Sequence, residues 1–323
     1  MSLVKKLSYR FLKLKFQIFE KFGVQPTFQK GGRCVLNYHG VVDSDELRFN
    51  SRFISTKTFE AHLDYFKTHF NVVSLIDLQA GINLSQDRFN IALTFDDGLQ
   101  NNFTRALPIL RKYETPATFC VCSAEEPVLW SDLLDLSCSL FPTETVHLFN
   151  EEWEFEKDGT RLKQRMLAAS EKQLSEFHTQ LRPCLEKIAE DEELTPFWKL
   201  LTKEELTELS KEPLIQLVAH GKNHLVLPSL TDSEIQQEVL DSMENVVQFG
   251  GDAFWFCYPN GKYSEETISL LRSLGVKHQI IVDSNGIHSE DLIARFVVNP
   301  HLSVSGLLYF LARGHYGYGR NTH

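Results

Sequence analysis

The amino-acid sequence predicts an α/β protein whose core is a parallel sheet or barrel. From residue 34 onward, short runs rich in β-branched and aromatic residues alternate with segments of helical periodicity, which is the pattern of successive β-α units. Polar residues directly follow several of these runs, and in a parallel barrel the carboxyl ends of all strands open on one face. At 323 residues, with 42% hydrophobic and 24% charged residues, the chain has the length and balance of one large enzyme domain.

The strands are expected where short apolar runs are bounded by polar or turn residues. They fall at residues 34–38, 72–75, 91–95, 118–121, 214–219, 254–258, 280–282 and 296–298. Helices are expected at residues 57–69, 101–113, 232–248 and 264–274. Two helix starts have a local cause. Thr231 and Glu234 have the spacing of a capping box, and Ser264 precedes two glutamates that suit the positive end of a helix dipole.

The alternation of strands and helices lapses between about residues 124 and 205. This segment is charged and helical in character, and its acidic run at 190–193 is most simply the solvated face of a helix. We therefore expect a helical insertion within a catalytic domain that spans residues 33–323.

Residues 1–32 are expected to form a separate basic helix. Residues 1–33 carry eight basic residues and one acidic residue, whereas the whole chain has a net charge of −10. Apolar residues recur at helical spacing there, at Leu3, Leu7, Phe11, Leu14 and Ile18. Such a helix can bind the anionic inner leaflet of a membrane through residues 1–30, or it can pack on its own domain. Charged residues interrupt every apolar stretch, so neither a secretory signal nor a membrane span is expected.

Charge and cysteine content restrict the setting of the protein. A net charge of −10 argues against a general nucleic-acid binder, which needs a basic face to displace counterions from phosphates. The six cysteines include no C-x-x-C pair, and a chain of this length needs no disulfides to fold. We therefore expect a cytoplasmic protein in peripheral contact with the inner membrane face.

Two adjacent carboxylates, Asp96 and Asp97, follow the apolar run 91–95. Asp-Gly is an ordinary turn dipeptide, so Asp97 and Gly98 taken alone indicate a structural turn. However, two carboxylates at the end of a buried strand cannot both ionise easily unless a cation is near. The pair therefore indicates one metal ligand and one proton acceptor.

Two histidines, His220 and His224, follow the apolar run 214–219. The motif HGKNH has the histidine spacing of a zinc protease, but it lacks the glutamate and contains Gly and Asn, which are poor helix formers. It therefore predicts a loop in which two imidazoles converge on a metal ion. Two histidines and one carboxylate leave positions open for water and substrate, as in catalytic metal sites; the same ligand set also serves non-haem iron oxygenases.

The motifs TFDDG, HGKNH and FCYPNGKY occur in this order, each with an apolar strand-like run. In these motifs the chain resembles the polysaccharide deacetylase family, the carbohydrate esterases that share homology with chitooligosaccharide deacetylase, over about residues 34–300. The motif VLNYHGVV resembles the branch that deacetylates poly-N-acetylglucosamine. The resemblance implies a distorted (β/α)7 barrel, a divalent metal ion that is usually zinc (Zn2+), and an N-acetylated glycan as the substrate.

The resemblance also implies roles for individual residues. Asp96 would be the general base. The metal ligands would be Asp97, His220 and His224. The third family motif normally has Arg two residues before its proline and an aromatic residue after it, whereas this chain has Cys257 and Asn260 there. Arg295 is the candidate replacement for the arginine that orients the catalytic aspartate.

The general acid has no clear counterpart, because the sequence shows no clear late Leu-x-His motif. His39, which follows the first apolar run, is the candidate acid, with a buried structural histidine as the alternative reading. His288 and His301 are further candidates for the acid. The backbone N–H of Asn260 would stabilise the oxyanion, and Tyr258 is a candidate substrate contact because aromatic faces suit sugar rings.

Together with these residues, the resemblance implies a metal-dependent hydrolase that removes N-acetyl groups from amino-sugar residues and releases acetate. A metal ion would lower the pKa of a water molecule from about 16 towards 7, so that Asp96 could remove its proton. Two alternatives stay open from the sequence. One is hydrolysis of O-acetyl esters or other amides on the same scaffold, and the other is a glycan-binding relative without turnover. An intact base beside a metal-ligand set argues against a pure binder.

Overall fold

The computed structural model describes residues 26–43, 49–123, 126–282, 291–300 and 302–312. The prediction of an N-terminal amphipathic helix falls almost entirely outside these residues, and the candidates His288 and His301 lie outside them. Within the described part of the chain, no helix has the length and apolar character needed to cross a lipid bilayer.

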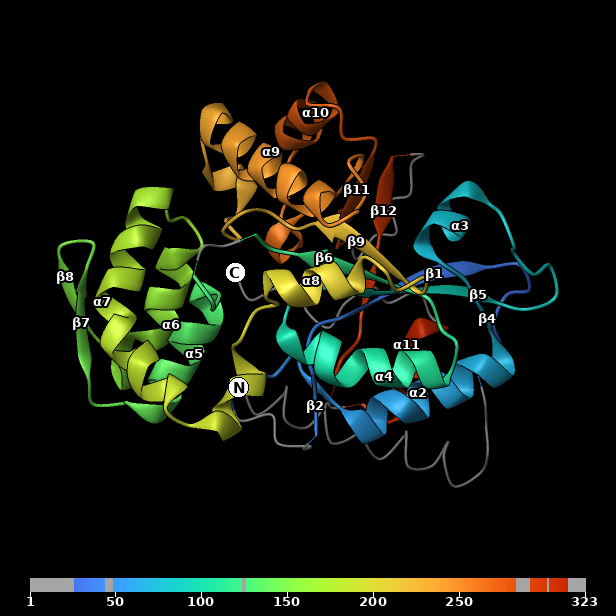
Figure 1. Ribbon diagram of the computed structural model, residues 1–323, viewed down its shortest axis with the longest axis horizontal. Coiled ribbons are helices and arrows are strands. Elements are labelled where there is room, and N and C mark those ends of the chain that lie inside the picture. The colour runs from blue at the N-terminus through green and yellow to red at the C-terminus, as the bar shows by residue number, and fades with distance from the viewer. Residues whose placement is uncertain (1–25, 44–48, 124–125, 283–290, 301, 313–323) are drawn as a thin grey trace, which may run out of the picture.

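A parallel sheet forms the centre of the molecule (Figure 1). Its strand order is β12-β11-β10-β9-β6-β5-β1-β13, and β4 pairs with β5 beside this path. The strands are β1 Arg33–Tyr38, β4 Asn71–Val72, β5 Asn90–Phe95, β6 Ala117–Val121, β9 Ile215–Ala219, β10 Trp255–Cys257, β11 His278–Ile281, β12 Leu292–Ala294 and β13 Phe296–Val297. All pairings within this sheet are parallel, as the βα alternation of the sequence predicts.

One short stretch of chain closes this sheet into a barrel. Only Arg295 separates β12 from β13; β12 pairs with β11 while β13 pairs with β1, so the two ends of the strand order meet. When β12 and β13 are counted as one position and β4 is set aside, seven barrel positions remain. The predicted (β/α)7 barrel is therefore confirmed, and the interruption at Arg295 is a point where it departs from regular geometry.

Side chains along the strands alternate between two apolar layers. One layer packs against the surrounding helices and includes Leu36, Leu93, Phe119 and Leu217. The other layer is small and fills the barrel interior; it includes Val35, Ala92, Cys120, Val218, Cys257, Ile280 and Ile293. The same alternation puts Asn37, Thr94 and Arg295 in line with the interior layer, so polar groups replace apolar ones towards the carboxyl end of the barrel.

The barrel helices are α2 Thr56–His69, α3 Leu75–Ala80, α4 Leu107–Lys112, α9 Asp232–Gln248, α10 Glu265–Ser273 and α11 Val304–Leu311. The helices α2, α9 and α10 begin and end within one residue of their predicted bounds, and the predicted helix at 101–113 is a π-helical turn, η1 Asn102–Ala106, followed by α4. The helices α3 and α11 were not among the predicted elements. Thr231 and Glu234 form the predicted capping box of α9. The strand expected at 72–75 is shorter than predicted, because Ser74 caps α3 and the chain becomes helical at Leu75. In Figure 1, α9 and α10 lie on one side of the sheet, and α2 and α4 lie on the other.

The segment between β6 and β9 forms a lobe beside the barrel (Figure 1). Its elements are α5 Trp130–Leu140, β7 Thr145–Leu148, β8 Glu151–Glu154, α6 Phe155–Met166, α7 Glu171–Ala189 and the 3-10 turn η2 Glu192–Phe197, after which α8 Lys203–Leu209 returns to the barrel. The lobe has an apolar core of its own, which includes Trp130, Leu133, Phe177 and Leu181. The antiparallel hairpin of β7 and β8 was not among the predicted elements.

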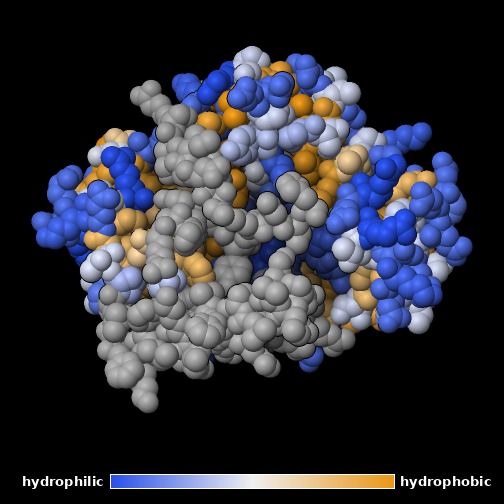
Figure 2. Space-filling model, turned by 180° about the vertical axis from the view of Figure 1, so that it is seen from behind, coloured by the Kyte–Doolittle hydropathy of each residue, from blue (hydrophilic) through white to orange (hydrophobic). Residues whose placement is uncertain are grey.

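In the view of Figure 2, the described surface is mainly hydrophilic along both sides, with apolar residues nearer the middle. The most exposed large apolar residues come from α3, α9 and the loops beside them; they are Ile76, Ile82, Leu240, Val247 and Phe254. These positions belong to the outer faces of barrel elements, where single exposed apolar side chains are ordinary.

Candidate metal centre and active site

Residues from two strands that are not neighbours meet at the carboxyl end of the barrel. Asp96 and Asp97 follow β5, and His220 and His224 follow β9, with β6 between the two strands. The structure brings together the three predicted metal ligands. Potential ligand atoms of Asp97, His220 and His224 all lie within 4.8 Å of one another, and the three side chains are buried.

The spacing of these atoms suits a divalent metal ion. Oδ1 of Asp97 lies 3.3 Å from Nε2 of His224 and 3.7 Å from Nε2 of His220. Bonds of about 2.0–2.1 Å to a tetrahedral zinc ion separate the ligand atoms by roughly 3.3–3.4 Å. Oδ1 of Asp97 is also a buried oxygen with no hydrogen-bond partner among the described residues. Leaving such an atom unpaired costs at least about 1–3 kcal/mol, which a cation between the three ligands would remove.

The backbone at two of these residues is held in a left-handed conformation. Asp97 has a φ of 78° and His224 a φ of 56°, and the glycines that follow Asp97 and His220 have φ values of 72° and 80°. A left-handed non-glycine residue costs roughly 1–3 kcal/mol and persists where the surrounding structure enforces it. Here the sharp turns direct the side chains after β5 and β9 towards each other.

A backbone contact orients the first histidine. Nδ1 of His220 lies 2.9 Å from the carbonyl oxygen of Cys257 on β10. Because a carbonyl can only accept, Nδ1 carries the proton, and the lone pair of the neutral ring is on Nε2, which faces Asp97. β10 therefore selects the tautomer that a metal ligand needs.

Glu238 of α9 holds the loop that carries both histidines. Its Oε1 accepts hydrogen bonds from the backbone N–H groups of Asn223, at 2.7 Å, and Leu225, at 3.2 Å. Burial raises the pKa of Glu238 to about 7, although the two N–H groups oppose this shift. A Cβ at Gly221 would lie 2.9 Å from the same carboxylate, so the loop requires glycine at that position.

The other strand-end carboxylate, Asp96, is paired with Arg295. The guanidinium donates from Nη1 to Oδ1 at 2.6 Å and from Nη2 to Oδ2 at 2.8 Å, and both residues are buried. Asn37 of β1 adds a hydrogen bond to Oδ2 at 2.9 Å. Burial opposes ionisation of Asp96, but Arg295 outweighs it and holds the pKa of this carboxyl well below its usual range. Oδ2 of Asp96 lies 4.0 Å from Nε2 of His220, so an ionised carboxylate stands beside the candidate metal ligands.

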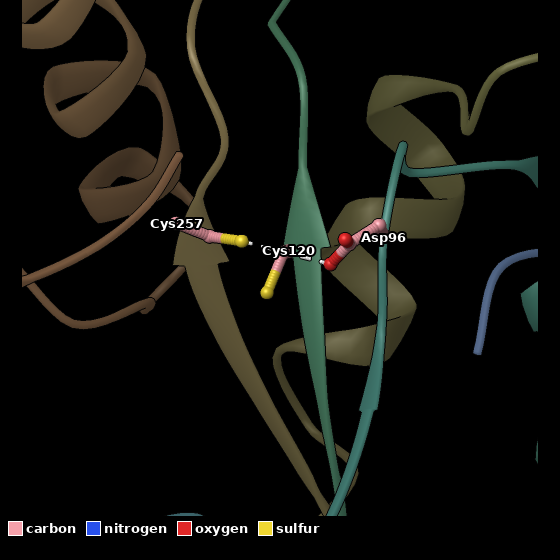
Figure 3. A group of neighbouring side chains, drawn as sticks. All are labelled: Asp96, Cys120 and Cys257. Atoms are coloured by element: carbon pink, nitrogen blue, oxygen red, sulfur yellow. Dashed lines mark hydrogen bonds between the residues drawn. The ribbon is translucent and has the colours of Figure 1, made fainter. Parts of the chain in front are cut away.

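A second group of potential ligand atoms consists of Asp96, Cys120 and Cys257 (Figure 3). The thiol of Cys257 donates to Oδ1 of Asp96 at 3.6 Å. This group is unsuited to a cation, because Arg295 already pairs with both oxygens of Asp96. A cysteine must also lose its proton to bind a metal, and burial raises the pKa of Cys257 well above its usual value.

A second arginine, Arg52, contacts the metal-ligand group. Its Nη1 donates to Oδ2 of Asp97 at 3.1 Å, and its Nη2 donates to Oδ1 of Asp132 on α5 at 2.8 Å. Burial raises the pKa of Asp132 to about 7 against the effect of Arg52, and the same arginine helps to keep the pKa of Asp97 well below its usual range. Sequence reasoning identified neither Arg52 nor Asp132.

His39 lies half-buried among the charges of this site. Burial lowers its pKa to about 4; the carboxylate of Asp97 opposes this shift and the guanidinium of Arg52 adds to it. The imidazole is therefore neutral at pH 7, and a bound cation would lower its pKa further.

The structure gives the two remaining predicted residues different positions. Asn260 is exposed in the 3-10 turn η4 (Pro259–Gly261), where its φ is 55°. Tyr258 is fully buried, and its hydroxyl donates to Oε1 of Gln279 at 2.6 Å. A ring without exposed surface, whose hydroxyl is already bonded inside the core, is not available to a sugar. The prediction that Tyr258 contacts substrate is therefore not supported by its position.

A polar cavity of about 270 Å3 lies between the helical lobe and the histidine loop. Lys222 and Asn223, from between the two histidines, form one wall, and α7 and the segment 126–130 that leads into α5 contribute the others. Arg182 of α7 pairs with Glu126 at 2.9 Å in this wall. The cavity thus offers hydrogen-bonding groups of both charge signs beside the loop that carries the candidate metal ligands.

Several solved structures have a similar fold. The Streptococcus pyogenes deacetylase PplD superposes with a TM-score of 0.56 at 18% identity, covering 88% of this chain and 98% of that one. IcaB from Ammonifex degensii gives a TM-score of 0.55 at 17% identity, with coverage of 88% and 99%. A de-N-acetylase from Aggregatibacter actinomycetemcomitans gives 0.55 at 17% identity, with coverage of 86% and 99%.

The sequence is also similar to a curated bacterial protein sequence and to a protein-family model. A Bacillus subtilis protein described as a polysaccharide deacetylase, YxkH, is 22% identical over 282 residues, which cover 84% of this chain and 73% of the relative. Residues 84–278 match the family described as Polysaccharide deacetylase, and this range contains Asp96, Asp97, His220 and His224. Because the match spans more than half of the chain, the protein belongs to the polysaccharide deacetylase family.

Proposed function

We propose that this chain is a metal-dependent hydrolase that removes N-acetyl groups from amino-sugar residues of a polysaccharide or glycan precursor. One observation carries the proposal. The buried group of Asp97, His220 and His224 lies directly beside Asp96, a carboxylate that Arg295 keeps ionised. A ligand set with open positions next to a fixed base is what amide hydrolysis requires.

The metal ion would be held by Asp97 Oδ1 and by Nε2 of His220 and His224. Its donor set of two imidazoles and one carboxylate suits zinc best, and when bound it supplies Lewis-acid activation of a water molecule and of the acetyl carbonyl. Asp96 then removes a proton from the attacking water. Arg295 keeps the Asp96 carboxylate ionised and fixes both of its oxygens, so the base needs no reorganisation during the reaction.

Breaking the C–N bond requires that the departing nitrogen gain a proton. His39 is the proposed donor to this amine. Since its pKa of about 4 makes it neutral at pH 7, it would have to receive the proton that Asp96 takes from water before it passes a proton on. Acetate and a free amino sugar then result, and the proton that the water loses is the one that the amine gains.

The remaining contacts concern the oxyanion and the glycan. The backbone N–H of Asn260 is the proposed oxyanion donor, because η4 follows β10 at the same end of the barrel; losing one such donor typically costs about 3 kcal/mol. The polar cavity beside the histidine loop is the proposed place for a neighbouring sugar. N-deacetylation is favoured over O-deacetylation because one protein of similar fold is described as a de-N-acetylase.

The deciding experiment is mass spectrometry of zinc-loaded protein incubated with N-acetylglucosamine oligomers. We expect products lighter by one acetyl group, with acetate released, and no product from protein carrying Asp96→Asn. If the wild-type protein acts on O-acetylated sugars but leaves N-acetyl groups untouched, the N-deacetylase proposal is wrong.

We also propose that residues 1–30 hold the protein on the anionic inner face of a membrane, on the basis of sequence alone. Each basic residue near an anionic surface contributes roughly 1 kcal/mol, and apolar insertion would add to it. Deleting residues 1–30 should then abolish salt-sensitive binding to vesicles that contain anionic lipid, while hydrolysis of a soluble oligomer continues. Unchanged vesicle binding after the deletion would rule this role out.

A further inference from the structure

The guanidinium of Arg52 joins the barrel to the helical lobe. On one side, Nη1 donates to Oδ2 of Asp97, the candidate metal ligand after β5, at 3.1 Å. On the other side, Nη2 donates to Oδ1 of Asp132 at 2.8 Å, and Asp132 belongs to α5 of the lobe. Two ion pairs therefore converge on one planar cation from two separate parts of the fold.

The contacts around Arg52 fix it in one orientation. Its Nε donates to Oδ1 of Asn50 at 3.2 Å, and Nδ2 of Asn50 donates to Oδ1 of Asp132 at 2.9 Å. Asp132 is 1% exposed and Asn50 4%, although both are polar. Burying a carboxylate this deeply is costly unless it is paired, and Arg52 and Asn50 supply the hydrogen-bond donors for Asp132.

This arrangement divides the two oxygens of Asp97 between two tasks. Oδ2 is occupied by Arg52, whereas Oδ1 accepts no hydrogen bond from the described residues and faces Nε2 of both His220 and His224. A carboxylate held in this way can offer a metal ion one oxygen only. Without the contact to Arg52, the carboxylate could rotate and bind with both oxygens, which raises the coordination number and takes a position that water or substrate would use.

We infer that Arg52 and Asp132 are positioning residues that keep Asp97 a one-oxygen metal ligand. The helical lobe therefore contributes to the geometry of the metal centre through Asp132. This inference rests on the metal centre of the proposed function. It assigns the lobe a role beyond enlarging the fold, because α5 supplies the carboxylate against which Arg52 is held.

The sign of the expected effects differs between the two residues. Removing Asp132 leaves the positive charge of Arg52 uncompensated beside the metal ion and also frees Arg52 to move, so both effects weaken metal binding. Removing Arg52 releases Asp97 but also removes a positive charge near the metal ion, so its two effects on affinity oppose each other. Metal affinity is therefore the readout for Asp132, and coordination geometry is the readout for Arg52.

The experiment uses the full-length chain and four variants: Arg52→Gln, Asp132→Ala, the double variant, and Asp135→Ala as the matched control. Asp135 lies one turn further along α5 and pairs with Lys163 inside the lobe, at 2.5 Å; its charge also acts on Arg52, so this variant reports the effect of losing a nearby charge without losing a hydrogen bond to Arg52. Zinc affinity is measured by competition with a chromophoric chelator. Coordination is measured from the visible absorption spectrum of cobalt-substituted protein, and thermal unfolding of the metal-free proteins reports on the fold.

We expect Asp132→Ala to weaken zinc binding on the order of 10- to 100-fold, as is typical for partners of metal ligands, while Asp135→Ala weakens it far less. Arg52→Gln should change the cobalt spectrum towards higher coordination, and adding Asp132→Ala to it should produce no further change in that spectrum. Asp132→Asn, whose amide oxygen can still accept from Arg52 but carries no charge, should recover only part of the zinc affinity lost in Asp132→Ala.

The inference is overturned if the Arg52→Gln spectrum matches that of the wild type, or if Asp132→Ala binds zinc as tightly as Asp135→Ala does. A loss of thermal stability with unchanged zinc affinity and spectrum would make the two residues a structural anchor only, which also overturns it. A wild-type chain that binds neither zinc nor cobalt would instead refute the metal centre itself, so the two failures are distinguishable.

Discussion

Arg295 pairs with both oxygens of Asp96 at the point where the barrel closes. The residue lies between β12 and β13, and its two contacts of 2.6 and 2.8 Å reach across to the end of β5. The family motif has its arginine at the position of Cys257, and here the thiol of Cys257 contacts the same carboxylate from β10 at 3.6 Å. The guanidinium thus reaches the base from another strand, and the fork geometry of Arg is what allows both oxygens to be fixed at once.

Replacing Arg295 should impair turnover without removing the metal ion. Arg295→Lys keeps a positive charge, but an ammonium group cannot pair with both oxygens of Asp96, so we expect kcat to fall on the order of 100-fold. Metal content should stay at the wild-type level. Steady-state kinetics and metal analysis test this, with Arg272→Lys as the control, because Arg272 pairs with Asp291 away from the site. Wild-type turnover in Arg295→Lys would contradict an orienting role.

Asp96 and the histidines should differ in what their loss removes. Asp96→Asn is expected to retain metal and to lose turnover by a factor on the order of a thousand or more, because the amide cannot take a proton from water. His220→Ala and His224→Ala are expected to lose the metal ion itself. Metal analysis beside rate measurements separates the two groups. Equal metal loss in all three variants would make Asp96 a ligand and reverse the roles of the two aspartates.

Removing the metal should abolish activity and leave the fold intact. The apolar clusters of the barrel and of the lobe do not include the metal-ligand residues, so the core does not depend on the ion. Chelation followed by far-ultraviolet circular dichroism and an activity assay checks this, and adding zinc back should restore activity. Activity that survives complete metal removal would refute the mechanism.

The raised pKa of Glu238 should make the stability of the protein depend on pH. A carboxyl whose pKa is about 7 in the fold and about 4.5 in the unfolded chain binds its proton more tightly when folded, so the free energy of unfolding falls as pH rises from about 4.5 through about 7. The contribution is at most about 3 kcal/mol. Glu238→Gln cannot ionise and keeps an acceptor for the backbone N–H groups of Asn223 and Leu225.

Urea unfolding of wild type and Glu238→Gln at pH 5 and pH 8 tests this prediction. The variant should gain stability relative to the wild type at the higher pH. Glu244→Gln, at an exposed position on the same helix, is the control and should show no such gain. If Glu238→Gln follows the wild type at both pH values, the carboxyl is ionised in the fold throughout, and its burial is less costly than the contacts indicate.

The residues that the sequence identified share a local signal. Asp96, Asp97, His220 and His224 each come directly after an apolar run, and strand ends converge on one face of a parallel barrel. Glu238 also has a local signal in the sequence. It lies on the apolar face of a correctly predicted helix, between Ile235 and Val239, where a charged residue is rarely buried unless it has hydrogen-bond partners.

Other features had no local signal. Arg52 and Asp132 meet Asp97 only through tertiary structure, and Asp132 lies in a segment whose charge suggested solvated helices. Periodicity also could not tell which face of its strand end Tyr258 would occupy, and the ring points into the core. The strand predicted at 72–75 ends early because Ser74 caps α3, and an apolar run gives no sign of where such a cap interrupts it.

The position of Arg295 sets an order in which the parts of the site become complete. All candidate metal ligands are present once the chain has reached His224, but the arginine that holds the base arrives with the last barrel strand. A chain emerging from its amino end would therefore contain every residue needed to hold a metal ion well before it contains the partner of Asp96. The loop that carries the histidines is then completed by Glu238 and by the carbonyl of Cys257, and the base is oriented last, when Arg295 closes the barrel.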